Sequence, residues 1–214
     1  MDEALRLSLE VLAVDVPLMI LLGVPLGWLL ARKAFPGRRV LELFVLIPVV
    51  LPPSVLGLYL LLALGQLPGV RAWRLLFSFP ALILGALIPA LPLVVQGARA
   101  GFSSVSRDLE DAARTLGDSE WRVFFRITLP LARRSLGAGL ALGTARALGE
   151  FGVSLMIAGN IPGVTQTLPL YIYSRAEALD FAAAHGAALL LAAVGVATLI
   201  FVRHLEEGRH DPVG

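Results

Sequence analysis

The chain contains no cysteine and only one lysine, Lys33, among its 214 residues. Without cysteine there is no disulfide framework, no thiolate metal site and no thiol nucleophile. Because Ala31 and Arg32 precede Lys33, the sequence holds no Gly-x-x-x-x-Gly-Lys-Ser/Thr phosphate-binding loop. If ATP drives this protein, the ATP must therefore bind to another chain.

Charged residues are also scarce. They make up 16% of the chain, whereas hydrophobic residues make up 57% and the mean hydropathy is +0.80. Soluble domains carry about 25% charged residues, so this composition excludes a soluble globular or a disordered protein. The basic residues separate long apolar runs, which is typical of a membrane protein rather than a nucleic-acid binder. The acidic start at Met1 lacks the basic region of a secretory signal, so we expect the first apolar run to be retained.

Five stretches are long and apolar enough to cross a membrane as helices of about 20 residues. They are residues 7–31, 43–65, 75–98, 135–158 and 181–202. Thirteen arginines and lysines flank these spans on one side and four on the other, and the richer side is expected to be cytoplasmic. The sequence thus predicts an all-α integral membrane domain over residues 1–214, with its N-terminus outside and its C-terminus in the cytoplasm.

Glycine and proline are placed within these spans in ways that predict packing and bending. Gly23-x-x-x-Gly27 and Gly139-x-x-x-Gly143 allow two helices to approach closely in lipid. Breaks are predicted in the second and third spans by their prolines, which are Pro48, Pro52, Pro53, Pro89 and Pro92. Such breaks either kink helices for packing or line a wet path or hinge.

The longest polar segment, residues 99–134, is predicted to form a helix, a turn and a second short helix. Ser106 is a suitable N-cap for the first helix, and Gly117 is a suitable stop. The second helix is expected to follow Asp118 or Ser119, and the stretch 127–130 to end it before the fourth span. An amphipathic loop helix can simply rest on the membrane or pack locally.

The same segment reads Asp111-Ala112-Ala113-x3-Gly117-x9-Ile127-x-Leu129-Pro130, and this pattern resembles the cytoplasmic "EAA" loop of permease subunits in ATP-binding-cassette importers. Asp111 stands where that family usually has glutamate. The resemblance implies a type I importer permease fold, in which this loop between spans three and four docks on the ATPase subunit. The residues expected to couple to the ATPase are Asp111, Ala112, Ala113, Gly117, Trp121, Phe124, Ile127, Leu129 and Pro130.

The stretches 145–152 and 158–169 resemble the molybdate branch of these permeases, which is close to the sulfate branch. The run from Gly159 to Thr167 favours molybdate over sulfate and does not separate molybdate from tungstate. Arg146 and Glu150 are neighbours on one helix face, either as a structural ion pair or beside the translocation path. The candidate path residues are Arg146, Glu150, Ser154, Asn160, Thr165, Gln166 and Thr167; the neutral donors among them could equally serve ordinary loop hydrogen bonding.

The resemblance also implies the assembly. It predicts a homodimer in the lipid bilayer of the inner membrane, two cytoplasmic ATPase subunits carrying ATP and magnesium, and an extracytoplasmic molybdate-binding protein. This chain itself is expected to bind no cofactor, metal or nucleic acid and to catalyse no covalent chemistry. The alternatives are a sulfate permease, an ATP-independent anion channel or carrier, and a non-transporting scaffold. Proton coupling is disfavoured because the sequence places only Glu150 near the centre of a span.

Overall fold

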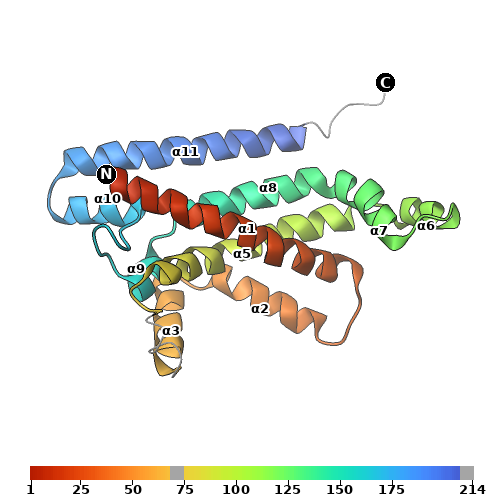
Figure 1. Ribbon diagram of the computed structural model, residues 1–214, viewed down its shortest axis with the longest axis horizontal. Helices are drawn as coiled ribbons and strands as arrows, with labels where there is room; N and C mark the ends of the chain where they lie inside the picture. The colour runs from red at the N-terminus through yellow and green to blue at the C-terminus, as the bar shows by residue number, and fades with distance from the viewer. Residues whose placement is uncertain (68–74, 208–214) are drawn as a thin grey trace.

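The computed structural model describes residues 1–67 and 75–207, and the regular elements within these two ranges are helices (Figure 1). Their bounds are α1 (Asp2–Arg32), α2 (Arg38–Val50), α3 (Pro53–Gln66), α5 (Phe79–Ser103), α6 (Arg107–Thr115), α7 (Glu120–Val123), the π-helical segment η1 (Phe124–Thr128), α8 (Leu129–Leu148), α9 (Gly152–Ala158), α10 (Leu168–Glu177) and α11 (Phe181–Glu207). The predicted all-α fold is confirmed.

Two helices, α1 and α5, are each long and apolar enough to cross a membrane alone. The face of α1 that packs on α5 is built from small and apolar residues, among them Met19, Gly23 and Gly27. A Cβ added at Gly27 would lie 2.5 Å from the Cβ of Ala98 in α5. The close helix approach predicted from the first glycine pair is therefore confirmed.

The contact between α5 and α8 is equally close. A Cβ added at Gly97 would lie 2.5 Å from the Cα of Gly139, so the two backbones touch where both residues lack a side chain. The predicted break of the third span is wrong, because α5 runs through Pro89 and Pro92 without interruption. Both prolines are buried against neighbouring helices, and this packing stabilises a helix that proline would otherwise weaken.

The second and fourth spans are not single straight helices. Helices α2 and α3 meet at 116° across Leu51 and Pro52, as the prolines predicted. Pro48, by contrast, stays inside α2. Helices α8 and α9 meet at 55° across 149–151, which corrects the expectation of one continuous helix over 135–158. In each bent pair the two helices are long and apolar enough to cross a membrane only when they are taken together.

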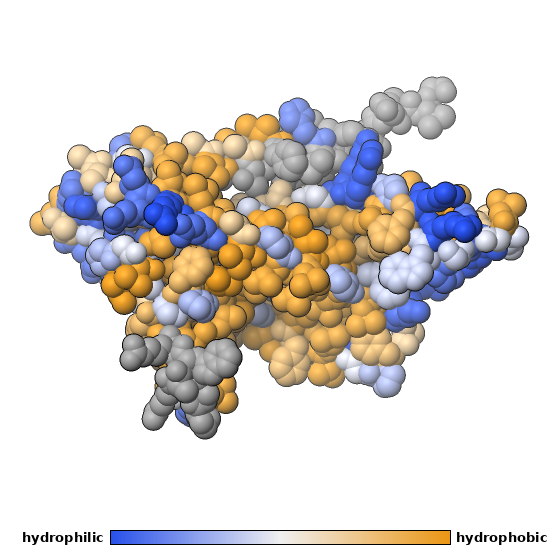
Figure 2. Space-filling view, viewed as in Figure 1, coloured by the Kyte–Doolittle hydropathy of each residue, from blue (hydrophilic) through white to orange (hydrophobic). Residues whose placement is uncertain are grey.

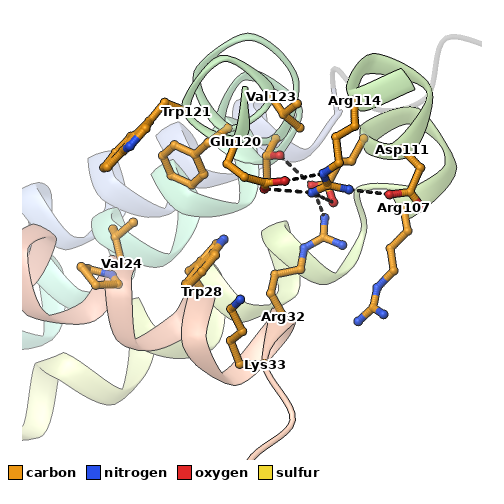
Figure 3. Close-up of a pocket in the computed structure, with 14 residues that line it drawn as sticks. Val24, Trp28, Arg32, Lys33, Arg107, Asp111, Arg114, Glu120, Trp121 and Val123 are labelled. Atoms are coloured by element: carbon orange, nitrogen blue, oxygen red, sulfur yellow. Dashed lines mark hydrogen bonds and ion pairs between the residues drawn. The ribbon is translucent and has the colours of Figure 1, made fainter. Parts of the chain in front are cut away.

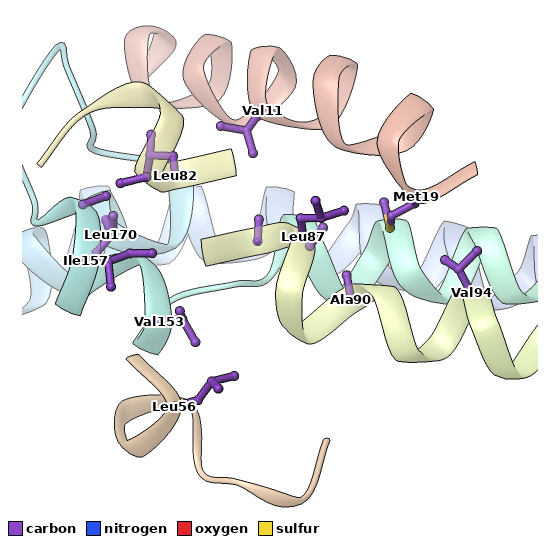
Figure 4. Close-up of a cluster of buried hydrophobic side chains, with 14 residues drawn as sticks. Val11, Met19, Leu56, Leu82, Leu87, Ala90, Val94, Val153, Ile157 and Leu170 are labelled. Carbon is purple, nitrogen blue, oxygen red and sulfur yellow. The ribbon is translucent and has the colours of Figure 1, made fainter. Parts of the chain in front are cut away.

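The two bends lie against each other. Helix α3 packs on α9, with Gly57 against Met156 and Gly152 against Pro53. The main core cluster joins these short helices to α1 and α5, and Figure 4 shows Leu56 pointing toward Val153 at this contact. The broken halves of two spans are therefore held together by apolar packing.

The remaining bounds also differ from those expected. The first helix begins at Asp2, before the predicted residue 7, and the third at Phe79 instead of residue 75. Helix α11 has a shorter apolar stretch, Phe181–Ala197, within its described part. Three of the basic residues counted for the orientation, Arg71, Arg74 and Arg209, lie outside the described residues.

The molecule is apolar in the middle and polar at both ends, as Figure 2 shows on the face in view. In Figure 1 the N-terminus lies beside α10 at one end, while α6 and α7 lie at the opposite end. Helix α11 runs back from the first end toward the second. The loop helices α6 and α7 therefore lie outside the apolar middle of the molecule, at the end opposite the N-terminus.

Candidate functional sites: a coupling loop and two helix breaks

The turn between α6 and α7 is built by local interactions. The Ser106 hydroxyl accepts a hydrogen bond from the backbone N–H of Asp108 at 3.2 Å and caps α6, as predicted. Gly117 has φ of +92°, a conformation that only glycine adopts without strain. The N–H of Asp118 then returns to the carbonyl of Ala113 at 3.1 Å. The helix cap and the glycine stop are both confirmed.

The second half of the loop differs from the prediction. The stretch 127–130 was expected to end the short helix before the fourth span, and this expectation is wrong. Helix α7 continues through η1 into α8, whose first turn contains Leu129 and Pro130. Proline is tolerated there because the chain widens into a π-helical turn just before it, which changes the hydrogen-bond register at the residue that has no N–H to donate.

The loop exposes small and apolar residues on α6, on the turn and on α7. Ala112, Leu116 and Gly117 are exposed, and Leu116 reaches 87% exposure. Trp121 is 74% exposed and stacks on Phe125, with 6.0 Å between ring centroids. Exposed aromatic and apolar side chains of this kind are common anchors at protein interfaces.

Other predicted coupling residues face inward. Ala113 is buried, and Ile127 and Leu129 are half-buried, whereas Asp111 and Pro130 are exposed. The ring of Phe124 packs on Phe102 of α5 with 6.1 Å between centroids. The structure therefore separates an outward tip from inward residues that hold the loop on the helix bundle.

A buried ion pair that the spacing did not predict joins the loop to α1. Arg32 lies 2.9 Å from Glu110, and their side chains are only 10% and 8% exposed. Glu110 also accepts a hydrogen bond from Thr128 at 2.6 Å, and Arg32 donates to the carbonyl of Val105 at 3.1 Å. This network fixes α6 to the end of the first span.

A second, exposed network stabilises the turn itself. Arg114 forms a two-pronged ion pair with Glu120 at 2.7 and 3.1 Å, and it also contacts Asp111. The hydrogen bonds from Arg114 hold the pKa of Glu120 below its usual range. Because this pair joins α6 to α7 across Gly117, it keeps the two short helices in one arrangement.

The predicted neighbours Arg146 and Glu150 form an ion pair at 2.6 Å, at the break between α8 and α9. The Glu150 side chain is 1% exposed and also accepts the N–H of Val153 at 2.7 Å, so it starts α9. The Arg146 side chain remains 31% exposed. The Glu150 carboxylate thus stabilises both the position of Arg146 and the bend between α8 and α9. The pair has a structural role, and part of the Arg146 guanidinium still remains accessible.

The other candidate path residues divide into two groups. Ser154 and Thr167 join Glu150 around a cavity of about 10 Å³, bounded also by Ser8 of α1. Such a volume holds about one water molecule. Within a single described subunit, this cavity is therefore no passage for a tetrahedral oxyanion.

The second group forms a network of side-chain hydrogen bonds in the turn before α10 and within α10. Asn160 donates to the Ser174 hydroxyl at 2.6 Å, and Gln166 donates to both, at 2.9 Å to Asn160 and 3.1 Å to Ser174. The buried Thr165 hydroxyl accepts the N–H of Ile161 at 3.0 Å. For these three predicted residues the structure favours loop hydrogen bonding over free donors toward a path.

With the loop and the breaks in place, the comparisons with known proteins decide the family. Residues 23–210 match the family of binding-protein-dependent transport system inner membrane components. The chain belongs to this family. As a permease subunit it is a multi-pass inner-membrane component of a transport system and a transporter subunit, not an enzyme.

Relatives of this permease carry two kinds of name. The molybdenum transport system permease protein ModB of Haemophilus influenzae is 43% identical, over 80% of this chain and 78% of that protein. The sulfate transport system permease protein CysW of Synechocystis is 34% identical, over 99% of this chain and 80% of that protein. The match to molybdenum permeases confirms the resemblance, and both cargo names remain represented.

The fold of the permease is that of a type I importer subunit. An inward-facing structure of the MetNI methionine ABC transporter superposes with a TM-score of 0.68, covering 94% of this chain and 94% of that one at 17% identity. This likeness supports the architecture alone. The roles of the individual coupling and path residues stay predictions.

The permease also contains a buried carboxylate that the sequence reasoning passed over. Asp15 in α1 is fully buried between Val11 and Met19 on the face toward α5, and neither carboxylate oxygen has a hydrogen-bond partner among the described residues. Glu150 is therefore not the only carboxylate buried within a span. The charge in an otherwise apolar run was the signal that could have identified it.

Proposed function

We propose that this chain is the permease subunit of a molybdate importer, which also accepts tungstate. Two copies form the pathway, two ATPase subunits dock on the paired α6–α7 loops, and a loaded binding protein delivers the oxyanion at the opposite end. The N-terminus lies outside and the C-terminus in the cytoplasm. ATP and magnesium bind to the ATPase subunits, and this chain binds neither.

The observation that carries the proposal is the α6–Gly117–α7 tip. Its outer surface presents Ala112 and Leu116 to a partner, while Glu110 and Phe124 anchor its inner side on α1 and α5. An element that is exposed on one side and rigidly held on the other can transmit the closure of an ATPase pair as a rigid-body movement. Movement of the tip would carry α1 and α8 with it.

The pathway is proposed to form between two copies at the bends. A single subunit has only a water-sized cavity beside Glu150, so the wider path must lie outside it, on the two-fold axis. The partly exposed Arg146 offers N–H donors to an oxyanion, while its pair with Glu150 weakens its hold. This balance suits transient contact with a passing anion better than a tight site.

Sulfate is the second candidate cargo, because permeases named for sulfate match nearly the whole chain. Sulfate and molybdate share charge and tetrahedral shape, and molybdate is larger. Path geometry in one subunit therefore does not separate them. Molybdate is placed first because the molybdenum permease shows the higher identity.

The test is uptake of labelled molybdate into vesicles that contain the assembled transporter, with tungstate and sulfate as competitors. We expect ATP-dependent uptake that equal tungstate reduces by about half and equal sulfate scarcely changes. A transporter with a hydrolysis-deficient ATPase subunit is the matched control. Competition by sulfate at equal concentration would assign the chain to sulfate, and uptake without ATP would support a channel or carrier.

A further inference from the structure

A large cavity lies between the end of α1 and the coupling loop, on the inner side of the α6–Gly117–α7 tip. Its volume is about 730 Å³, and residues of α1, α6, α7 and η1 line it. Figure 3 shows Lys33, Arg32 and Arg107 along one side and Glu120, Arg114 and Asp111 along the other. The proposed function gives this cavity no role.

The cationic residues around the cavity differ in whether they form ion pairs. Arg32 and Arg114 are held by carboxylates of the cavity wall. Lys33 and Arg107 are exposed and form no ion pair with a described residue, although the Lys33 ammonium lies 5.5 Å from the centre of the Trp28 ring. The cavity therefore offers two cations to an anionic ligand.

The other wall of the cavity is apolar and extends toward the membrane. Val24, Pro25 and Trp28 of α1 line it. Val24 lies eight residues before Arg32, which corresponds to about 12 Å along a helix. A ligand that fills the cavity must therefore place an anionic group near Lys33 and an apolar group along α1.

We propose that this cavity binds an anionic phospholipid. The phosphate of the headgroup lies between Lys33 and Arg107, and one acyl chain follows Val24 and Trp28. Basic pockets between membrane helices bind acidic lipid headgroups in this manner, and the apolar wall distinguishes a lipid from a free anion. The bound lipid joins the end of α1 to the beginning of α6, beside the buried Arg32–Glu110 pair.

The experiment uses tryptophan quenching by lipids with brominated chains. The full-length protein carries Trp73→Phe, so that the remaining tryptophans, Trp28 and Trp121, both line the cavity. In bilayers of phosphatidylcholine, brominated phosphatidylglycerol is expected to quench saturably at a low mole fraction, whereas brominated phosphatidylcholine quenches only in proportion to its amount. Non-saturable quenching by both lipids would overturn the proposal.

Two double variants separate this site from general surface charge. Lys33→Gln with Arg107→Gln should raise the half-saturating fraction roughly 30-fold, because each cation contributes roughly a fivefold factor to anionic lipid binding and the two factors multiply. Arg39→Gln with Arg126→Gln removes two exposed arginines that do not line the cavity and should leave the fraction unchanged. Equal shifts in both double variants would refute a defined site.

Two further arms identify the occupant. Millimolar inorganic phosphate should not displace the lipid, and displacement would show a site for free anions only. Addition of the ATPase subunits should leave the saturable quenching in place, whereas its loss would assign the cavity to the ATPase. Neither arm measures transport or cargo, so a failure here is distinct from a failure of the proposed function.

Discussion

Replacing Glu110 with alanine should detach the coupling loop from the helix bundle. Glu110 is the carboxylate that both Arg32 and Thr128 contact, at 2.9 and 2.6 Å. In the variant, Arg32 keeps only the carbonyl of Val105 as a hydrogen-bond partner among the described residues, and it stays within a site where its side chain is 10% exposed. Removing one member of a buried ion pair is costly because the remaining charge has lost its water and its partner.

The expected loss is about 3–5 kcal/mol in the free energy of opening α6, and the lower value applies because both side chains retain slight exposure. A loss of about 3 kcal/mol makes local opening more than about a hundredfold more frequent. Amide hydrogen exchange in 107–115 should accelerate by that factor, while exchange in α5 stays unchanged. Binding of the ATPase subunits should weaken in parallel.

Two variants sharpen this test. Glu120→Ala removes a carboxylate from the exposed pair with Arg114 and should change exchange in α6 only slightly, because exposed ion pairs contribute little. Arg32→Met combined with Glu110→Leu removes both buried charges and should recover most of the protection. The reasoning would be refuted by unchanged exchange in Glu110→Ala, or by a double variant as unprotected as the single one.

Three further predictions concern the turn, the bend and the helix contact. Gly117→Val should keep the protein in the membrane but abolish co-purification with the ATPase, because valine is strained at φ +92°. Gly117→Asn should retain more of the co-purification. Normal ATPase binding by the valine variant would contradict this prediction. Arg146→Ala should reduce both uptake and assembly, the latter measured by size-exclusion chromatography, because Glu150 is left buried without its cation. Adding Glu150→Gln to this variant should restore assembly. Equal assembly defects in the single and the double variant would exclude a compensating pair. Gly97→Ala should lower the thermal unfolding temperature, because overpacking costs about 1–3 kcal/mol of stability. Gly186→Ala should not lower it, because the space around Gly186 is open. Equal unfolding temperatures for the two variants would contradict the close contact at Gly97.

Much of the local structure followed from short spacings along the chain. The cap at Ser106, the stop at Gly117 and the pairing of Arg146 with Glu150 depend on residues only a few positions apart. The glycine pair in α1 predicted a close helix contact, because the absence of a side chain lets any neighbouring helix approach closely. Such features are set by helix geometry and need no knowledge of the fold.

Other features could not be found in this way. Arg32 and Glu110 are 78 residues apart, and nothing in either neighbourhood indicates the other. For Asn160 and Gln166 the sequence left a role toward cargo and ordinary loop hydrogen bonding equally open, because their partner Ser174 is brought in only by the turn before α10. The polarity of a side chain alone does not distinguish a donor to cargo from a donor to its own loop.

The scarcity of charged residues predicts a membrane protein, and the position of the single lysine predicts that any ATP that drives it binds to another chain. Hydropathy and basic residues predict spans and orientation because the membrane acts on each segment separately. The tertiary structure alone decided that the fourth span bends and meets the bend of the second, and that Asp15 is buried with no hydrogen-bond partner among the described residues. It also decided that an open cavity with charged and apolar walls lies at one end of the bundle. These outcomes depend on packing between helices far apart in the chain, which no local pattern records.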